Sequence, residues 1–215
     1  MVRVVLYCEG SREGGRRAAQ PDAPGDRLDE EALGPAHILC RRAIAARTLV
    51  PEAAVHFEAP LRTHRGTVPQ GSDLLVRKTL RRLLTWPSTR SLPDLAVVLV
   101  DRDGDEGRAA LLRNHVGDLV LPRRVIGVAI EEFEAWLIAD AATIEQITAL
   151  PVSAVASPEH MVRGAAKSQL AKWSAGSSAP QVHREVASRC DLNVVCRHCR
   201  AFESFSSDLQ QALIT

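Results

Sequence analysis

Short apolar runs alternate with amphipathic stretches along the chain, and this alternation predicts an α/β fold. Four runs rich in β-branched residues predict strands at Val2–Cys8, Ala54–Ala59, Leu95–Val100 and Arg124–Ile130. The first run is apolar on both faces, which is typical of a strand in a parallel sheet covered on both sides. Stretches with helical spacing follow each strand, at Asp29–Thr48, Asp73–Trp86, Gly107–Val116 and Phe133–Ala139. This order predicts a parallel sheet flanked by helices.

The chain divides into two parts by pattern. Residues 1–145 carry all four predicted strands, and residues 146–215 are helical and polar in type. We expect an α/β core followed by a helical C-terminal extension packed on it. Gly34-Pro35 should delay the start of the first helix, and the tail from Gln181 predicts two short helices. Ser11–Arg27 is rich in Gly and Pro, which predicts a surface loop.

The composition is that of an ordinary globular protein. The chain has 215 residues, of which 46% are hydrophobic and 25% charged, and its net charge of +1 does not indicate nucleic-acid binding by the whole surface. The chain has five cysteines, an odd number, and we see no secretory signal in the sequence. A disulfide framework is therefore not expected. Cys190, Cys196, His198 and Cys199 do not have the spacing of a usual zinc site. No apolar stretch approaches the ~20 residues that cross a bilayer, and we expect a cytoplasmic protein.

Acidic residues follow three of the four predicted strands. They are Glu9 and Glu13 after the first strand, Asp101, Asp103 and Asp105 after the third, and Glu131, Glu132 and Glu134 after the fourth. Sites in open α/β sheets lie outside the carboxyl ends of the strands, and neighbouring strands are only about 4.8 Å apart. Clustered carboxylates need a compensating charge, and hard oxygen ligands select Mg²⁺ or Mn²⁺. We therefore predict a metal held by Glu9, Asp101 and Asp103, with Asp105 and Glu132 as further ligands.

The same acids have simpler interpretations. Strand ends are often polar, and Asp101–Asp105 could form a solvated turn in which Asp105 or Glu106 caps the next helix. Asp101 and Asp103 are two residues apart, so in an extended segment they would point the same way. Glu134 is expected to face solvent on its helix.

Several basic residues are candidates for phosphate contacts. Lys167 and Arg163 are candidates for a cation that contacts a phosphate, although Lys167 could equally be an exposed helix residue. Arg77 and Arg81 lie on one basic helix face and Arg62 in a loop, positions suited to nucleic-acid backbone contacts. The alternative for the helix is an ordinary solvated face.

The acidic motifs resemble those of the Toprim fold, found in topoisomerases, primases and the overcoming-lysogenization-defect nucleases. The matching segments are Glu9-Gly10 and Asp101-Arg102-Asp103, and Glu13 could supply the second early acid of the nuclease branch. A closer resemblance is to a bacterial family of small Toprim-like proteins that carries only a domain-of-unknown-function label. It rests on Glu132–Asp140, which contains Glu-Ala-Trp-Leu, and on the tail segment Cys199–Phe205.

The resemblance implies metal-dependent phosphodiester chemistry, in proteins often met beside an ATPase in phage-defence settings. The leading hypothesis is therefore a Mg²⁺- or Mn²⁺-dependent nuclease, with Glu131 or Glu13 holding a second ion or acting as base, and Lys167 near the phosphate. A non-catalytic module that binds an ATPase partner and a phosphoryl or nucleotidyl transferase are the alternatives. The chain carries no P-loop motif. The substrate could be DNA or RNA. The sequence also leaves open whether the protein forms a homo-oligomer.

Overall fold

A four-stranded parallel sheet forms the centre of the protein. The computed structural model describes residues 1–9, 25–64, 66–69, 71–117, 119, 122–174 and 178–214, so Glu13 lies outside the described residues. The strands are β1 (Val2–Cys8), β2 (Val55–Glu58), β3 (Leu95–Asp101) and β4 (Arg123–Ala129), in the spatial order β2-β1-β3-β4. All neighbouring pairs are parallel. The four predicted strands are confirmed to within about two residues at their ends.

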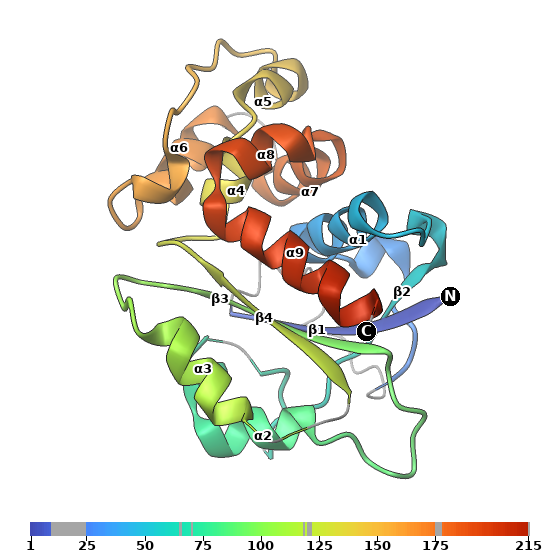
Figure 1. The fold of residues 1–215 in the computed structure, drawn as a ribbon. Helices are drawn as coiled ribbons and strands as arrows, with labels where there is room; N and C mark the ends of the chain where they lie inside the picture. Colours follow the sequence, from blue (N-terminus) through green and yellow to red (C-terminus); the bar gives the residue numbers. More distant parts are fainter. Residues whose placement is uncertain are drawn as a thin grey trace.

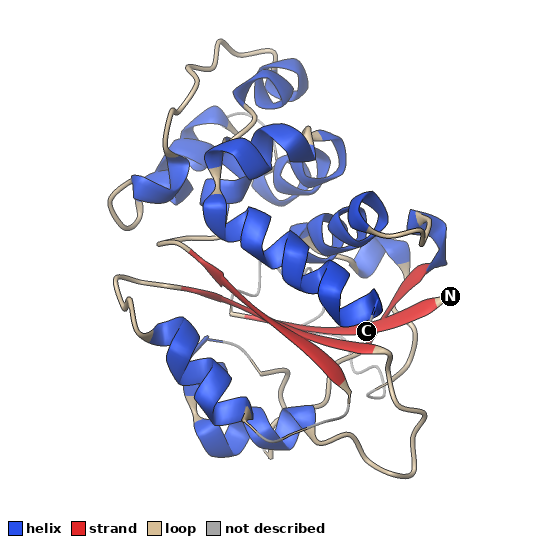
Figure 2. Ribbon diagram, in the orientation of Figure 1, coloured by secondary structure: helices blue, strands red, loops and turns tan. Residues whose placement is uncertain are grey.

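Helices cover both faces of the sheet, which confirms the predicted α/β fold. Helices α1 (Pro35–Arg47) and α9 (Arg200–Ile214) lie on one face, and α2 (Arg77–Leu84) and α3 (Arg108–Val116) on the other (Figures 1 and 2). Side chains alternate accordingly, since Val4 and Leu6 belong to the core under α1, while Val5 and Tyr7 belong to the core under α2. The apolar runs on both faces of the strands thus match helices on both sides.

The strand order places the ends of β1 and β3 side by side. The chain passes from β1 through α1 to β2 on one side, and then returns through α2 to β3 on the other side of β1. This reversal makes the β1–β3 boundary the topological switch point, where ligands of open α/β sheets bind. Cys8 pairs with Leu99, and Asp101 pairs with Ala129 of β4. The residues that follow β1, β3 and β4 therefore emerge at one edge of the sheet.

Two predicted helices begin later than their apolar pattern suggests. The segment predicted from Asp29 forms a 3-10 turn at Glu30–Ala32, and α1 then begins at Pro35, the first helical position, where the missing N–H of proline costs no bond. Gly34-Pro35 thus delays the helix as expected. The segment predicted from Asp73 behaves similarly, with a 3-10 turn at Gly71–Leu75 before α2.

The C-terminal part is helical and shares its core with the sheet. It contains α4 (Glu134–Ile138), α5 (Ala141–Thr148), α6 (Ala165–Trp173), α7 (Ala179–Arg189) and α8 (Leu192–His198), followed by α9. The tail forms three helices in place of the predicted two, because the Asp191 side chain caps α8 at Asn193 N and Cys199 is extended before α9. Helix α9 packs along β4 and α1, and α7 packs on α1. No helix of the described chain is long and apolar enough to cross a membrane.

A glycine in β4 lets helix α9 approach the sheet closely. A Cβ atom added to Gly127 would lie 2.7 Å from Phe205 Cδ2 of α9 and 3.0 Å from Leu99 Cδ1. Phe205 is held in place by the ring of Trp136, with centroids 5.6 Å apart and an interplanar angle of 24°. Gly127 is thus required by packing.

We expect Gly127→Ala to destabilise the protein by about 1–3 kcal/mol, because the added methyl overpacks a contact that cannot relax freely. Urea unfolding of the wild type and variant measures the change. Phe205→Leu removes the ring atoms that the methyl would meet, so the double variant should lose less stability than the two single changes together. Strict additivity of the two would contradict this account of Gly127.

Candidate functional site

Seven acidic side chains gather where β1, β3 and β4 end, and we call this set the acidic edge. Its members are Glu9, Asp101, Asp103, Asp105, Glu131, Glu132 and Glu134. The ends of β3 and β4 point into the space between α6 and α3 (Figure 1). Four cations contact these acids, namely Arg102, Arg108, Arg163 and Lys167. The seven acids and four cations therefore give the described edge a formal charge of −3.

The carboxylates of Glu9 and Asp101 join neighbouring strand ends through backbone amides. Glu9 Oε2 accepts a hydrogen bond from Asp101 N at 2.9 Å, across the β1–β3 switch point. Asp101 Oδ1 in turn accepts from Phe133 N at 2.8 Å, in the turn after β4. These two bonds fix the side chains of two predicted metal ligands at adjacent strand ends, as the strand pattern predicted.

Asp103 does not follow Asp101 in the predicted direction. Strand β3 ends at Asp101, and Asp103 has a φ of 52°, in the left-handed region. The segment is therefore a turn, so the extended spacing that would align the two side chains is absent. Asp103 instead pairs with Arg163 Nε at 3.0 Å and with Arg108 Nη1 at 3.3 Å.

Arg108, which the sequence reasoning did not single out, lies among the three predicted ligands. It is the first residue of α3 and is only 9% exposed. Its Nη1 donates to the Asp101 carbonyl oxygen, and lies 3.3 Å from Asp103 Oδ2 and 3.9 Å from Glu9 Oε2. One guanidinium nitrogen thus contacts groups from Glu9, Asp101 and Asp103 together.

The acids after β4 face a second set of partners. Glu131, with a φ of 57°, pairs with Arg102, and Glu132 Oε2 accepts from Lys167 N at 3.1 Å. Glu134 is only 2% exposed, so the expectation that it faces solvent is wrong. Its Oε1 lies 3.6 Å from Lys167 Nζ, whereas its buried Oε2 has no hydrogen-bond partner among the described residues. A buried polar atom of this kind is an exception, since most are hydrogen-bonded to protein or water.

The two predicted phosphate-binding cations both reach the acidic edge. Arg163, two residues before the start of α6, is exposed and pairs with Asp103, and the side chain of Lys167 is about half exposed. Both therefore combine a fixed contact to an acid with access to solvent, as a phosphate ligand would require.

The remaining candidates have structural contacts or lie elsewhere. Asp105 Oδ1 accepts from Gly107 N at 3.0 Å and so helps to cap the start of α3. Arg81 reaches the carbonyl oxygens of His115 and Val116 at the end of α3, and Arg62 donates to Gly66 O at 3.0 Å. Arg77 is exposed in the first turn of α2.

The acidic edge has the donor chemistry of a hard divalent ion but is filled by a guanidinium. Within the described part of the chain, no three or more His, Cys, Asp or Glu side chains are grouped so that they could hold an ion together. The carboxylates suit Mg²⁺ or Mn²⁺, and the buried Glu134 oxygen lacks a partner. The oxygen donors are thus of the type that such an ion prefers, but Arg108 lies between the carboxylates of Glu9 and Asp103.

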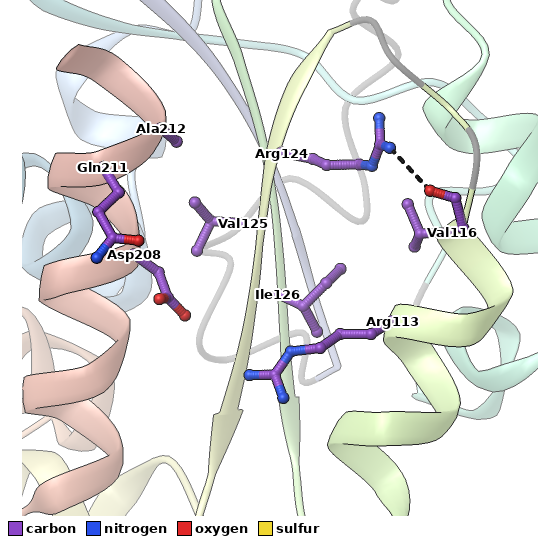
Figure 3. A pocket seen from close by; sticks show the side chains of 9 residues that line it. Arg113, Val116, Arg124, Val125, Ile126, Asp208, Gln211 and Ala212 are labelled. Atoms are coloured by element: carbon purple, nitrogen blue, oxygen red, sulfur yellow. Dashed lines mark hydrogen bonds between the residues drawn. The ribbon is translucent and has the colours of Figure 1, made fainter. Parts of the chain in front are cut away.

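A separate pocket of about 590 Å³ opens on the free edge of β4. It lies between α3 and α9, with Arg113 and Arg124 on one side and Asp208 on the other (Figure 3). Arg124 donates to Gly117 O at 3.4 Å. The pocket lies at the far end of α3 from Arg108, and no residue of the acidic edge lines it.

The Glu-Ala-Trp-Leu segment and the tail motif form a buried aromatic cluster. Trp136 packs edge-on against Phe133 and Phe202, with centroids 5.6 and 5.2 Å apart. Its Nε1 donates at 3.1 Å to Glu159, whose carboxylate also accepts from Ala201 N at the start of α9. Asp140, the last residue of the segment, caps α5 and accepts from Asp191 N at 2.8 Å. These motif residues support the turn that carries Glu131, Glu132 and Glu134.

Together these features define an α/β protein with an acidic site at the switch point of a parallel sheet. Residues 35–210, more than four-fifths of the chain, match the family described as Domain of unknown function (DUF4276), and the chain belongs to that family. The family description names no activity. Comparison with curated proteins gave no significant match, and comparison with solved structures gave none either.

Burial raises the pKa of Glu159 above its ordinary value, although hydrogen bonds from Ala201 N and Trp136 oppose the shift. A carboxyl with a raised folded-state pKa stabilises the fold below its unfolded pKa and loses that contribution as the pH rises through the folded value. Glu159→Gln cannot titrate, so its stability relative to the wild type should rise between pH 4 and pH 7. Urea unfolding of both proteins at the two pH values measures this. A relative stability that stays constant or falls with pH would contradict the assignment.

Proposed function

We propose that the acidic edge is the catalytic centre of a divalent-metal-dependent phosphodiester hydrolase, and that the protein is a nuclease. The observation that supports this proposal is that the carboxylates of Glu9 and Asp103 and the backbone carbonyl oxygen of Asp101 approach one cationic nitrogen at the switch point of the sheet. That position demands positive charge and offers hard oxygen donors. The resemblance to Toprim nucleases points to the same chemistry.

Glu9, Asp101 and Asp103 would hold the ion, Mg²⁺ or Mn²⁺, with Asp105 and Glu132 as further ligands. A bound ion of this kind activates water and stabilises the leaving oxygen. Glu131, or Glu13 outside the described residues, would hold a second ion or take the proton from the attacking water. Glu131 pairs with Arg102, and this ion pair holds its carboxylate within the acidic edge.

Two cations of this chain would bind the substrate phosphate. Lys167 has its backbone held by Glu132 and its ammonium near Glu134, which fixes the side chain at the end of β4. Arg163 pairs with Asp103, and its side chain is exposed to solvent. Each would place positive charge where negative charge develops on the phosphate. Arg62, Arg77 and Arg81 would contact the backbone of DNA or RNA further away.

The cellular role follows only from the resemblance. Proteins with these motifs are met beside an ATPase in phage-defence settings, so we propose that the chain is the effector of such a pair. An ATPase would then be the partner that controls access of nucleic acid to the acidic edge.

A non-catalytic binding module is the second candidate, and Arg108 favours it. This guanidinium, with the backbone amides of Asp101 and Phe133, already compensates the acids without an ion. A module of this kind would use the fold to hold a partner protein, and its strand-end acids would serve structure alone.

Calorimetric titration of Mn²⁺ into the wild type, Glu9→Gln and Asp101→Asn separates the two candidates. Both amides retain an oxygen that can accept the bonds from Asp101 N and Phe133 N, so the fold should survive while the ligand charge is lost. We expect binding by the wild type and at least about tenfold weaker binding by each variant, equivalent to about 1.4 kcal/mol.

Plasmid DNA and total RNA incubated with Mg²⁺ or Mn²⁺ in parallel test catalysis. Arg189→Gln serves as a control outside the ligand set and the proposed nucleic-acid contacts, because Arg189 is exposed and pairs with Glu185 within α7. Cleavage by the wild type and by Arg189→Gln, lost in both acid variants, is the expected result. Absence of metal binding both by the wild type and by Arg108→Gln, which lacks the guanidinium beside Glu9 and Asp103, would reject the nuclease and favour the binding module.

A further inference from the structure

Arg108 is a buried cation that contacts all three predicted metal ligands. Its Nη1 donates to the Asp101 carbonyl oxygen and lies 3.3 Å from Asp103 Oδ2 and 3.9 Å from Glu9 Oε2. Its side chain is 11% exposed. A charge removed from water to this degree needs nearby opposite charge, and the acids supply it.

The helix does not hold the guanidinium in this position. Arg108 opens α3, where the positive end of the helix dipole disfavours a cation. The favourable contacts therefore come from the strand-end acids. They are also incomplete, because the buried Nε of Arg108 has no hydrogen-bond partner among the described residues.

The guanidinium has an exit toward solvent. Asp105 Oδ2 lies 3.9 Å from Arg108 Nε, and the Asp105 side chain is half exposed. Rotation of the long Arg108 side chain past Asp105 into solvent would take the guanidinium away from Glu9 and Asp103. The Arg108 charge thus has two places to reside.

A divalent ion and the Arg108 guanidinium cannot share these oxygens. Like charges a few ångströms apart in a partly buried site repel strongly, since water screens them poorly there. We propose that Arg108 is the resident counter-ion of the acidic edge, and that a divalent ion binds only when the guanidinium moves away. This inference rests on the proposed metal site and makes Arg108 a determinant of metal affinity.

The competition has a direct consequence for binding. A metal ion can bind only after the Arg108 contacts with the acids are broken. The cost of breaking them reduces the observed free energy of metal binding. Removal of the guanidinium should therefore tighten metal binding, whereas removal of an ordinary supporting residue would weaken it. The two roles predict changes of opposite sign.

Titration of Mn²⁺ alone into the wild type, Arg108→Gln and Arg102→Gln, followed by calorimetry, tests the inference. Arg102 is the matched control, because it belongs to the same edge and carries the same charge but pairs with Glu131. We expect Arg108→Gln to bind Mn²⁺ at least about tenfold more tightly than the wild type. Arg102→Gln should change the affinity much less, since it affects only the general charge.

The outcomes separate the inference from the proposed function. Mn²⁺ binding by the wild type with equal or weaker binding by Arg108→Gln overturns the role of Arg108 and leaves the metal site standing. Equal tightening by both variants also overturns it, because net charge alone would then explain the gain. Binding by neither the wild type nor Arg108→Gln rejects the proposed metal function together with the inference.

Arginine modification of the wild-type protein provides a test that needs no variant. Phenylglyoxal reacts with accessible guanidinium groups, and peptide mapping by mass spectrometry locates the adducts. We expect little adduct at Arg108 in metal-free protein and clearly more when saturating Mg²⁺ is present. Modification of Arg108 that is unchanged or lower with Mg²⁺ would overturn the inference, even where Arg108→Gln fails to fold.

Discussion

Negative charge at the ends of adjacent parallel strands must be compensated, and this requirement organises one whole end of the protein. The strand order brings Glu9, Asp101 and the acids after β4 to a single edge, where strands about 4.8 Å apart leave them no room to separate. Backbone amides take up part of the charge through Asp101 N and Phe133 N. Side-chain cations take up more of it, and a negative excess remains among the described residues.

The surrounding elements are arranged around this charge. Helix α3 contributes Arg108 from its first residue. Helix α6 contributes Lys167, and Arg163 lies two residues before that helix. Asp103 and Glu131 adopt left-handed backbone conformations that turn the chain sharply at the strand ends. Such conformations are uncommon outside glycine and often occur at functional sites. The aromatic cluster around Trp136 supports the same edge. Trp136 packs against Phe202 and Phe205 of α9, and this packing anchors the segment that follows β4.

The fold was largely predictable because strand and helix periodicity are local signals. The Val2–Cys8 and Leu95–Asp101 runs and the delay at Gly34-Pro35 needed no knowledge of tertiary contacts. Of the site, the acids and the two cations Arg163 and Lys167 were predictable. The burial of Glu134 and the turn at Asp103 depend on how α6 and α3 pack, which no local pattern reports. Arg108 left one signal, because it is a cation in the first helical turn, three residues after Asp105, where the helix dipole opposes it. The Glu134 oxygen without a partner could be found only in the structure.

The central claim is that one position at the switch point holds either the Arg108 guanidinium or a divalent ion. Crystals of the protein grown with and without MnCl₂, with anomalous diffraction collected at the manganese edge, examine that position directly. The account predicts an anomalous peak among Glu9, Asp101 and Asp103, with the Arg108 side chain turned toward solvent. A map without a peak at the strand ends, with Arg108 in the same place in both crystals, would contradict it.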